Sequence, residues 1–278
     1  MRLKTVYDML TYAERRAADY IIANPAEAMN LSVQELAQRA DTSPATVMRM
    51  AGKAGYESFP ALKIDLARNY EREPAEDFII DIEDTPSDIT HKLSSIFNDI
   101  SRDMADMIDP AVGKLILDKI STGRKIYILG SLGSSIAAKD LHYKLMRIDK
   151  DAIYNEDSQL QLIVSALSTK EDVVIAFSYR GETEEVLKPV RQHKKNGAYV
   201  IAVTGCFRSE LAGMSDTVIN IPGFEGDFRL GSIASRYAQL FVSDFIFLGV
   251  TQGDFDNAKR RILDTRNAVL NSAKHTVS

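Results

Sequence analysis

The spacing of apolar residues changes once along this 278-residue chain, close to Gly123. Before that glycine, apolar residues recur at intervals of three and four, the period of helices that bury one face. After it, five short runs rich in β-branched residues alternate with helical segments, at 125–129, 152–154, 172–177, 198–203 and 217–221. Apolar runs separated by amphipathic helices indicate a parallel sheet covered on both faces. The sequence therefore predicts an all-α domain followed by an α/β three-layer sandwich.

The boundary between the two parts is predicted within residues 71–88. This stretch is rich in Asp and Glu and contains two prolines, which is typical of a linker. We expect a helical domain over 1–73, an acidic linker and connecting helix over 74–108, and the α/β domain over 109–278.

Two short helices in the helical domain have the signals of a helix-turn-helix. The first begins after Ser32, which forms a capping-box pair with Glu35. The second begins at Pro44 and stops at Gly55. Helices of this length joined by about three residues have the spacing of a DNA-reading motif, so the second helix is the candidate reader. The candidate DNA contacts, predicted at its start and on its side or outer face, are Ser43, Ala45, Thr46, Arg49 and Lys53. An alternative is that Arg49 pairs with Asp41 or Glu57.

Two strand-to-helix turns have the chemistry of an anion site. They read GSLGSS at 130–135 and SYRGET at 178–183. Glycine lets the backbone approach a ligand, hydroxyls donate to phosphate oxygens, and a helix N-terminus attracts negative charge. Both turns are expected at the carboxyl ends of parallel strands, where such sheets bind ligands. The predicted ligand contacts are Gly133, Ser134, Ser135, Gln159, Ser178, Arg180, Gly181, Glu182 and Thr183.

Neither turn by itself identifies a particular ligand or fold family. The first has neither the GxGxxG spacing of dinucleotide-binding folds nor the Gly-Lys-Ser/Thr of a P-loop. Each turn can also be an ordinary strand-to-helix connection with capping hydroxyls. For Arg180 the alternative to ligand contact is an ion pair with an adjacent acid at 182, 184 or 185.

Taken as a pair, the turns resemble the sugar isomerase (SIS) domain, a phosphosugar-binding module, over roughly residues 110–250. That family's second turn usually reads Ser-x-Ser-Gly-x-Thr; Ser178, Gly181 and Thr183 match, and Arg180 stands where the second serine usually is. Residues 31–67 resemble the RpiR-type helix-turn-helix through Ser-x-x-x-Leu-Ala, Ser-x-x-Thr-Val-x-Arg and Gly-Tyr-x-x-Phe-Pro-x-Leu-Lys. The two resemblances imply a regulator of carbohydrate metabolism that senses a sugar phosphate, a phosphorylated hexose or amino sugar, and alters operator affinity.

Composition and hydropathy bear on disulfides, metal sites and the cell compartment. Cys206 is the only cysteine, so no intrachain disulfide forms and a Cys-based metal site is not expected. The N-terminal residues have no continuous apolar core of the signal-peptide kind, and the most apolar stretch, 238–250, is interrupted by Asp244 and too short to span a bilayer. We expect a cytoplasmic homodimer or tetramer that binds operator DNA and a sugar phosphate, without a metal, a cofactor or a membrane.

The competing hypothesis is a phosphosugar isomerase with an accessory helical domain. Isomerisation needs a positioned acid or base, and of the four histidines only His142 lies near a predicted turn. Glu156, Asp157 and Glu182 are the other candidates, but no acid–base pair is evident, so we expect a sensor and not an enzyme. A third hypothesis is a sensor whose partner is a protein in place of DNA.

Overall fold

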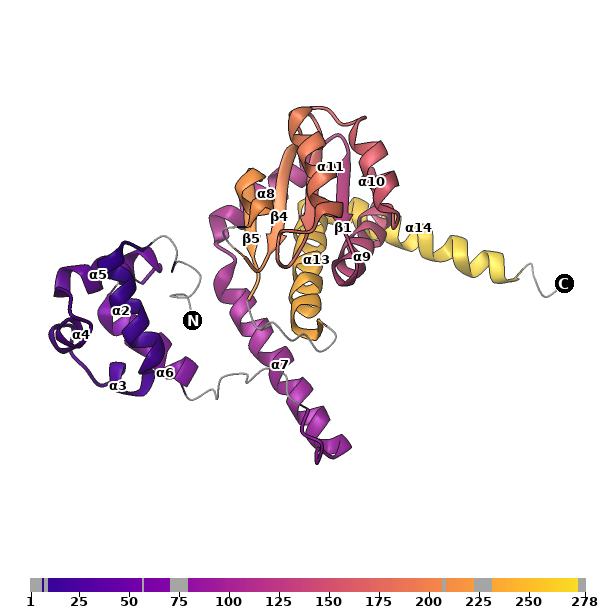
Figure 1. The fold of residues 1–278 in the computed structure, drawn as a ribbon. Helices are drawn as coiled ribbons and strands as arrows, with labels where there is room; N and C mark the ends of the chain where they lie inside the picture. The colour runs from indigo at the N-terminus through magenta and orange to yellow at the C-terminus, as the bar shows by residue number, and fades with distance from the viewer. Residues whose placement is uncertain are drawn as a thin grey trace. The chain divides into compact units, whose positions relative to one another are not determined.

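The computed structural model describes Tyr7 and residues 10–56, 58–70, 80–206, 209–222 and 232–274 (Figure 1). Contacts divide the chain into two units, Met1–Ile79 and Ile80–Ser278. Each unit has a hydrophobic core of its own. The predicted division into a helical part and an α/β part is confirmed.

The first unit is helical throughout its described residues. Its elements are α2 (Tyr12–Ala23), α3 (Pro25–Ala28), α4 (Val33–Arg39), α5 (Pro44–Lys53) and α6 (Phe59–Tyr70). Their apolar faces meet in one core that includes the fully buried Ile21, Leu36, Val47, Met50 and Leu62.

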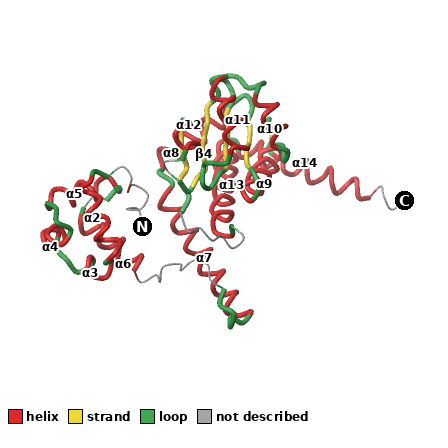
Figure 2. The backbone as a smooth tube through the Cα atoms, viewed as in Figure 1, coloured by secondary structure: helices red, strands yellow, loops and turns green. Residues whose placement is uncertain are grey.

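The second unit is built around a five-stranded parallel sheet (Figure 2). Its strands are β1 (Ile126–Gly130), β2 (Ala152–Ile153), β3 (Val173–Phe177), β4 (Tyr199–Thr204) and β5 (Thr217–Asn220). Each lies within a residue or two of the run predicted from the sequence. Its helices are α7 (Pro86–Met107), α8 (Pro110–Thr122), α9 (Gly133–Arg147), α10 (Ser158–Ser165), α11 (Glu184–Lys195), α12 (Glu210–Met214), α13 (Ile233–Gly253) and α14 (Phe255–Lys274).

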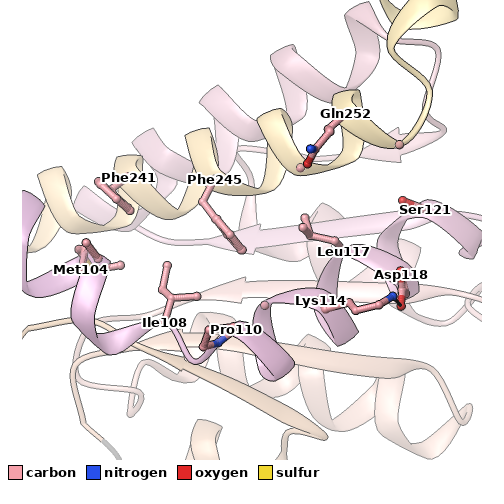
Figure 3. Close-up of a pocket in the computed structure, with 14 residues that line it drawn as sticks. Met104, Ile108, Pro110, Lys114, Leu117, Asp118, Ser121, Phe241, Phe245 and Gln252 are labelled. Atoms are coloured by element: carbon pink, nitrogen blue, oxygen red, sulfur yellow. Dashed lines mark hydrogen bonds and ion pairs between the residues drawn. The ribbon is translucent and has the colours of Figure 1, made fainter.

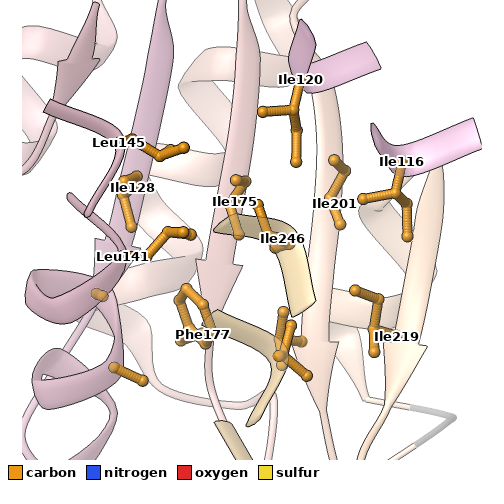
Figure 4. Close-up of a cluster of buried hydrophobic side chains, with 14 of the residues drawn as sticks. Ile116, Ile120, Ile128, Leu141, Leu145, Ile175, Phe177, Ile201, Ile219 and Ile246 are labelled. Atoms are coloured by element: carbon orange, nitrogen blue, oxygen red, sulfur yellow. The ribbon is translucent and has the colours of Figure 1, made fainter. Parts of the chain in front are cut away.

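The sheet is buried on both faces at its centre because β1, β3 and β4 are almost entirely apolar. Alternate residues point to opposite sides, so Ile128 joins one core while Tyr127 and Leu129 join the other. Ile128, Ile175 and Ile201 are register partners on neighbouring strands and form the centre of the larger core (Figure 4). Helices α7, α8, α9 and α13 cover that face, and α11 and α12 cover the other.

Two further helices, α7 and α13, pack into the core of the second unit. Ile100 and Met104 of α7 are fully buried in the larger core, so the C-terminal half of the predicted connecting helix packs onto the sheet domain. Helix α13 is long and apolar enough by composition to span a membrane. One side of α13 nevertheless packs into the same core through Ala238, Val242 and Ile246.

Candidate functional site

The two predicted anion turns lie side by side at a topological switch point. The strand order is β2-β1-β3-β4-β5, so the chain leaves β1 toward one edge of the sheet and leaves β3 toward the other. Gly130, the last residue of β1, is the register partner of Phe177, the last residue of β3. Open parallel sheets form a ligand crevice at such a point, between the carboxyl ends of the diverging strands.

The first turn leads into α9, and its Ser134 hydroxyl is held by a residue of α13. Ser134 Oγ accepts a 3.0 Å hydrogen bond from Nε2 of Gln239, a buried residue of α13. Ser135 Oγ instead donates to the Leu132 carbonyl at 2.5 Å. Within the part of the chain that the structure describes, the Ser134 hydroxyl hydrogen has no protein acceptor.

The second turn is closed by its own hydroxyls and by a glycine. Ser178 is 3% exposed; its Oγ accepts from the Gly181 N–H at 3.2 Å and donates to Thr183 Oγ1 at 3.3 Å. Gly181 has φ +68°, and a Cβ there would lie 2.0 Å from Ser209 Oγ. The turn therefore requires glycine both for its backbone angle and for the packing of Ser209. Thr183 is the N-cap of α11, so the start of that helix faces the crevice.

Arg180 is exposed and makes no ion pair with any residue that the structure describes. Two of its three neighbouring acids have other partners. Glu182 Oε1 accepts from the Glu210 N–H at 2.8 Å, and Glu184 pairs with Arg191. The carboxylate of Glu182 is therefore directed to the start of α12, which argues against its predicted contact with a ligand.

Two side chains near the first turn were missed by the sequence analysis. Gln161 is 2% exposed and donates to the carbonyls of Gly130 at 3.0 Å and Asn155 at 2.7 Å. The predicted Gln159, two residues earlier on α10, is exposed instead. Tyr154 follows β2; burial raises the pKa of its phenol and outweighs the opposing effect of the Ser135 hydroxyl. Periodicity on α10 is the signal that could have distinguished the two glutamines.

No acid–base pair for isomerisation emerges among the described residues. Burial lowers the pKa of His142, so its ring is neutral at pH 7, and the ring centre lies 6.1 Å from that of Tyr154. The described residues also contain no group of three or more His, Cys, Asp or Glu side chains placed to hold a metal ion.

In the first unit, α4 and α5 have the predicted caps. Ser32 and Glu35 form the capping box, and Ser43 Oγ accepts from the Thr46 N–H at 3.2 Å. Gly55, with φ +78°, ends the second helix in the left-handed conformation expected of a helix stop.

The prediction of which α5 side chains are exposed is wrong at one position. Thr46, predicted toward the side or outside, is only 5% exposed, and its hydroxyl is hydrogen-bonded to that of Ser43 at 2.9 Å and accepts from Arg49 at 3.0 Å. Ala45, Arg49 and Lys53 are exposed as predicted.

Arg49 and Lys53 both have a buried acidic partner on α2. Lys53 Nζ lies 2.7 Å and Arg49 Nε 3.8 Å from the carboxylate of Glu14. Burial acts to raise the pKa of Glu14, but hydrogen bonds from Lys53 and Thr11 outweigh it and lower the pKa. The proposed alternative partner Asp41 pairs with Arg16, and Glu57 lies outside the described residues.

A separate groove of about 630 Å³ lies between α7, α8 and α13 (Figure 3). Met104, Ile108, Leu117 and Phe245 are among its lining residues, and none of them belongs to the two turns. This groove is therefore distinct from the crevice at the switch point.

Comparison with known proteins matches both units. Residues 1–73 match the rpiR-family helix-turn-helix domain, and residues 119–249 match the SIS domain. Together these matches define a helix-turn-helix transcriptional regulator with a SIS domain. The chain belongs to the RpiR-type proteins that join these two domains in this order.

Relatives span nearly the whole chain. It is 28% identical to HTH-type transcriptional regulators of Clostridium perfringens and Bacillus subtilis, over 94% and 96% of this chain and 95% of each relative. Among solved structures it resembles NanR of Vibrio vulnificus, complexed with ManNAc-6P, with 25% identity, a TM-score of 0.63 and 97% of each chain covered. The sugar isomerase domain of an RpiR transcription factor from Sphaerobacter thermophilus shares the fold at 12% identity, with a TM-score of 0.58 over 64% of this chain and 98% of that one.

Proposed function

We propose that this regulator binds operator DNA through its helix-turn-helix unit and a sugar phosphate at the turns 130–135 and 178–183, and that the sugar phosphate changes its affinity for DNA. The observation that carries the proposal is the pairing of the two turns at the switch point. There the Ser134 hydroxyl hydrogen and the Arg180 guanidinium have no protein partner among the described residues. Both are donors suited to phosphate oxygens, and both lie beside helix N-termini.

The ligand contacts follow from this geometry. Ser134 supplies its hydroxyl hydrogen, and Arg180 supplies a planar cation that can bind phosphate through two parallel hydrogen bonds. The rest of the contact surface is formed by the turn residues Gly133, Ser135, Ser178, Gly181 and Thr183. The ManNAc-6P complex of Vibrio vulnificus NanR supports a phosphorylated hexose or amino sugar as the effector class. The protein acts in the cytoplasm on carbohydrate genes, as an oligomer with more than one DNA-binding head.

Regulation requires that the effector bind two arrangements of the protein with different affinity. Helix α13 is placed to transmit such a difference. Its Gln239 holds Ser134 of the first turn, and two residues earlier Tyr237 packs on Phe97 of α7 with ring centres 4.4 Å apart. Helix α7 in turn lies at the start of the second unit, next to the segment that leads from the DNA-binding unit.

The test is fluorescence anisotropy of labelled DNA from upstream of the gene, titrated with protein at fixed salt and repeated with hexose, amino-sugar and pentose phosphates. We expect sequence-specific binding that one class of sugar phosphate shifts. Arg180→Ala should weaken that response while leaving DNA affinity without sugar unchanged, whereas Lys195→Ala, an exposed cation on α11, should change neither. Binding no tighter than to random DNA, with and without sugars, would contradict the proposal and direct the work to isomerase turnover.

A further inference from the structure

Glu14 is a buried carboxylate in the DNA-binding unit, and it is not among the predicted DNA contacts. It is the third residue of α2 and is 1% exposed. Its Oε2 accepts from the Thr11 N–H at 2.7 Å, within the capping box of α2, and from Lys53 Nζ at 2.7 Å. Its other oxygen, Oε1, lies 3.8 Å from Arg49 Nε. Glu14 thus connects the start of α2 to the exposed side of α5.

Helix capping alone does not account for the surroundings of Glu14. Glu35 occupies the same position in the capping box of α4, but it is exposed and makes no ion pair with any residue that the structure describes. Burying a carboxylate is costly unless charged partners and hydrogen bonds compensate for the lost water. Both charged partners of Glu14 belong to the predicted DNA-reading face, so its effect reaches that face as well as its own helix.

Arg49 is held along one edge of its guanidinium. Nη2 donates to Thr46 Oγ1 at 3.0 Å, and Nε, on the same edge, faces the carboxylate of Glu14. Thr46 is fixed in turn by its hydrogen bond to Ser43. The outer edge, formed by Nη1 and the second N–H of Nη2, has no acceptor among the described residues, and the side chain is 62% exposed. Arg49 therefore presents two parallel N–H donors to solvent from a position that the protein restricts.

These two donors match the edge of one base. Guanine presents its O6 and N7 acceptors side by side in the major groove, and an Arg fork that binds both is the commonest specific contact there. The reading helix of a helix-turn-helix lies in that groove. Ala45 and Gly52, about one turn before and after Arg49, are exposed and small, and a Cβ at Gly52 would meet nothing within 4 Å. Arg49 therefore projects beyond these neighbours.

Lys53 is affected by the same carboxylate in a different way. Its ammonium is bonded to Glu14, so a DNA phosphate must compete with that carboxylate for its charge. Phosphate contacts provide most of the affinity for DNA of any sequence, whereas base contacts distinguish sequences. Glu14 therefore weakens the first kind of contact through Lys53 and supports the second through Arg49.

We propose that Glu14 is a positioning residue for sequence recognition: it holds Arg49 so that the outer edge of the guanidinium binds a guanine of the operator, and it restrains Lys53 from the phosphates. The inference rests on the proposed function, since it requires binding to operator DNA. It assigns part of the sequence specificity to a residue of α2, outside the reading helix, and it predicts a G·C base pair in the operator.

The test compares the full-chain wild type with Glu14→Gln, Arg49→Ala and Glu35→Gln. The probes are the duplex that the wild type selects from a pool of random sequence, copies with each base pair changed in turn, and an unselected duplex. Fluorescence anisotropy at fixed salt measures binding. Glu14→Gln removes the charge but keeps an acceptor for the capping box, where Gln serves as well as Glu. Glu35→Gln is the matched control, because it makes the same change in the other capping box.

We expect one G·C pair whose replacement weakens wild-type binding about tenfold, with little effect on Arg49→Ala. Glu14→Gln should reduce this penalty to about threefold, because a mobile guanidinium loses more conformational freedom on making the same contact. The variant should also bind the unselected duplex more tightly than the wild type does, since a negative charge has been removed. Glu35→Gln should keep the wild-type penalty.

A second variant covers the case in which Glu14→Gln leaves an uncompensated cation and does not fold. Glu14→Gln/Lys53→Gln replaces the buried ion pair by two neutral side chains and keeps the net charge of the wild type. It should show the same reduced penalty at the G·C pair. Circular dichroism and thermal melting check that each variant is folded.

Failure of this inference differs from failure of the proposed function. A wild type that selects no sequence overturns both. When a sequence is selected, an Arg49-dependent pair other than G·C, or equal losses on every duplex in Arg49→Ala, overturns the guanine contact. A wild-type penalty in the folded Glu14 variants, with or without weaker binding to all duplexes, shows that Glu14 is only structural and overturns its positioning role.

Discussion

Ser134 shows how one hydroxyl in the crevice is oriented by a side chain far away in sequence. Gln239 Nε2 donates to its oxygen at 3.0 Å, which leaves the serine hydrogen for a ligand. Replacing Gln239 with leucine would let that hydroxyl rotate to a protein acceptor. We expect Gln239→Leu to weaken sugar phosphate binding about fivefold, since one buried hydrogen bond contributes on the order of 1 kcal/mol.

Isothermal titration calorimetry with the effector found in the DNA assay measures this change. Gln252→Leu, at an exposed position near the end of the same helix, serves as the matched control and should bind normally. Equal affinity of Gln239→Leu and wild type would mean that Ser134 does not donate to the ligand.

His193 is a buried histidine that the crevice does not use. Burial lowers its pKa to about 4, although the carboxylate of Asp172 acts to raise it. The ring is fully buried beside Tyr127, with ring centres 4.6 Å apart. Because the unfolded chain binds a proton near pH 6.5 and the folded chain does not, stability is greatest above pH 6.5 and falls as the pH drops toward 4.

The expected loss from His193 is roughly 3 kcal/mol across that window. His193→Phe keeps a ring in the same space and removes the titration. Urea unfolding at pH 5.0 and 7.5 should therefore show a smaller pH difference in the variant than in wild type. Some difference remains because burial also lowers the pKa of His142. An unchanged pH difference would show that folding does not lower the pKa of His193.

At the scale of elements, α5 contains a glycine that the helix does not require. Gly52 is exposed, and a Cβ there would meet nothing within 4 Å. Glycine within a helix costs about 1 kcal/mol relative to alanine. Gly52→Ala should therefore raise the melting temperature of the first unit by several degrees.

Gly55 provides the matched comparison for that prediction. Its φ of +78° is strained for any residue with a Cβ, so Gly55→Ala should lower the same melting temperature. Scanning calorimetry measures both variants. A Gly52→Ala protein that melts at or below the wild-type temperature would contradict the helical assignment of α5 around this residue.

The whole molecule has two units with separate cores, which predicts two unfolding transitions. The Gly52→Ala variant identifies the transition of the first unit. A saturating sugar phosphate should shift chiefly the other transition, since a ligand at 100 times its dissociation constant stabilises the unit that binds it by about 2.7 kcal/mol. A calorimetric shift confined to the first unit would place the ligand outside the crevice.

Much of the local structure could be predicted from the sequence. Apolar runs predicted all five strands, because a parallel sheet covered by helices on both faces is built from strands that are mostly apolar. Ser32, Ser43 and Gly55 predicted the limits of α4 and α5, because helix ends are decided by bonds between residues close in sequence. The same reasoning from neighbouring residues identified the two strand-to-helix turns at 130–135 and 178–183.

The hydrogen-bond partners and the burial of polar side chains could not be predicted from local sequence patterns. Thr46 was placed toward the outside but is buried, Gln161 and not Gln159 reaches the end of β1, and Gln239 bonds to a serine 105 residues away. The sequence by itself determined the elements, their order and the two turns, because these depend on local hydrogen bonding and hydrophobic period. Only the tertiary structure decided that the turns meet at β1 and β3 and which polar groups have partners, because strand order and packing bring together residues that no spacing rule connects.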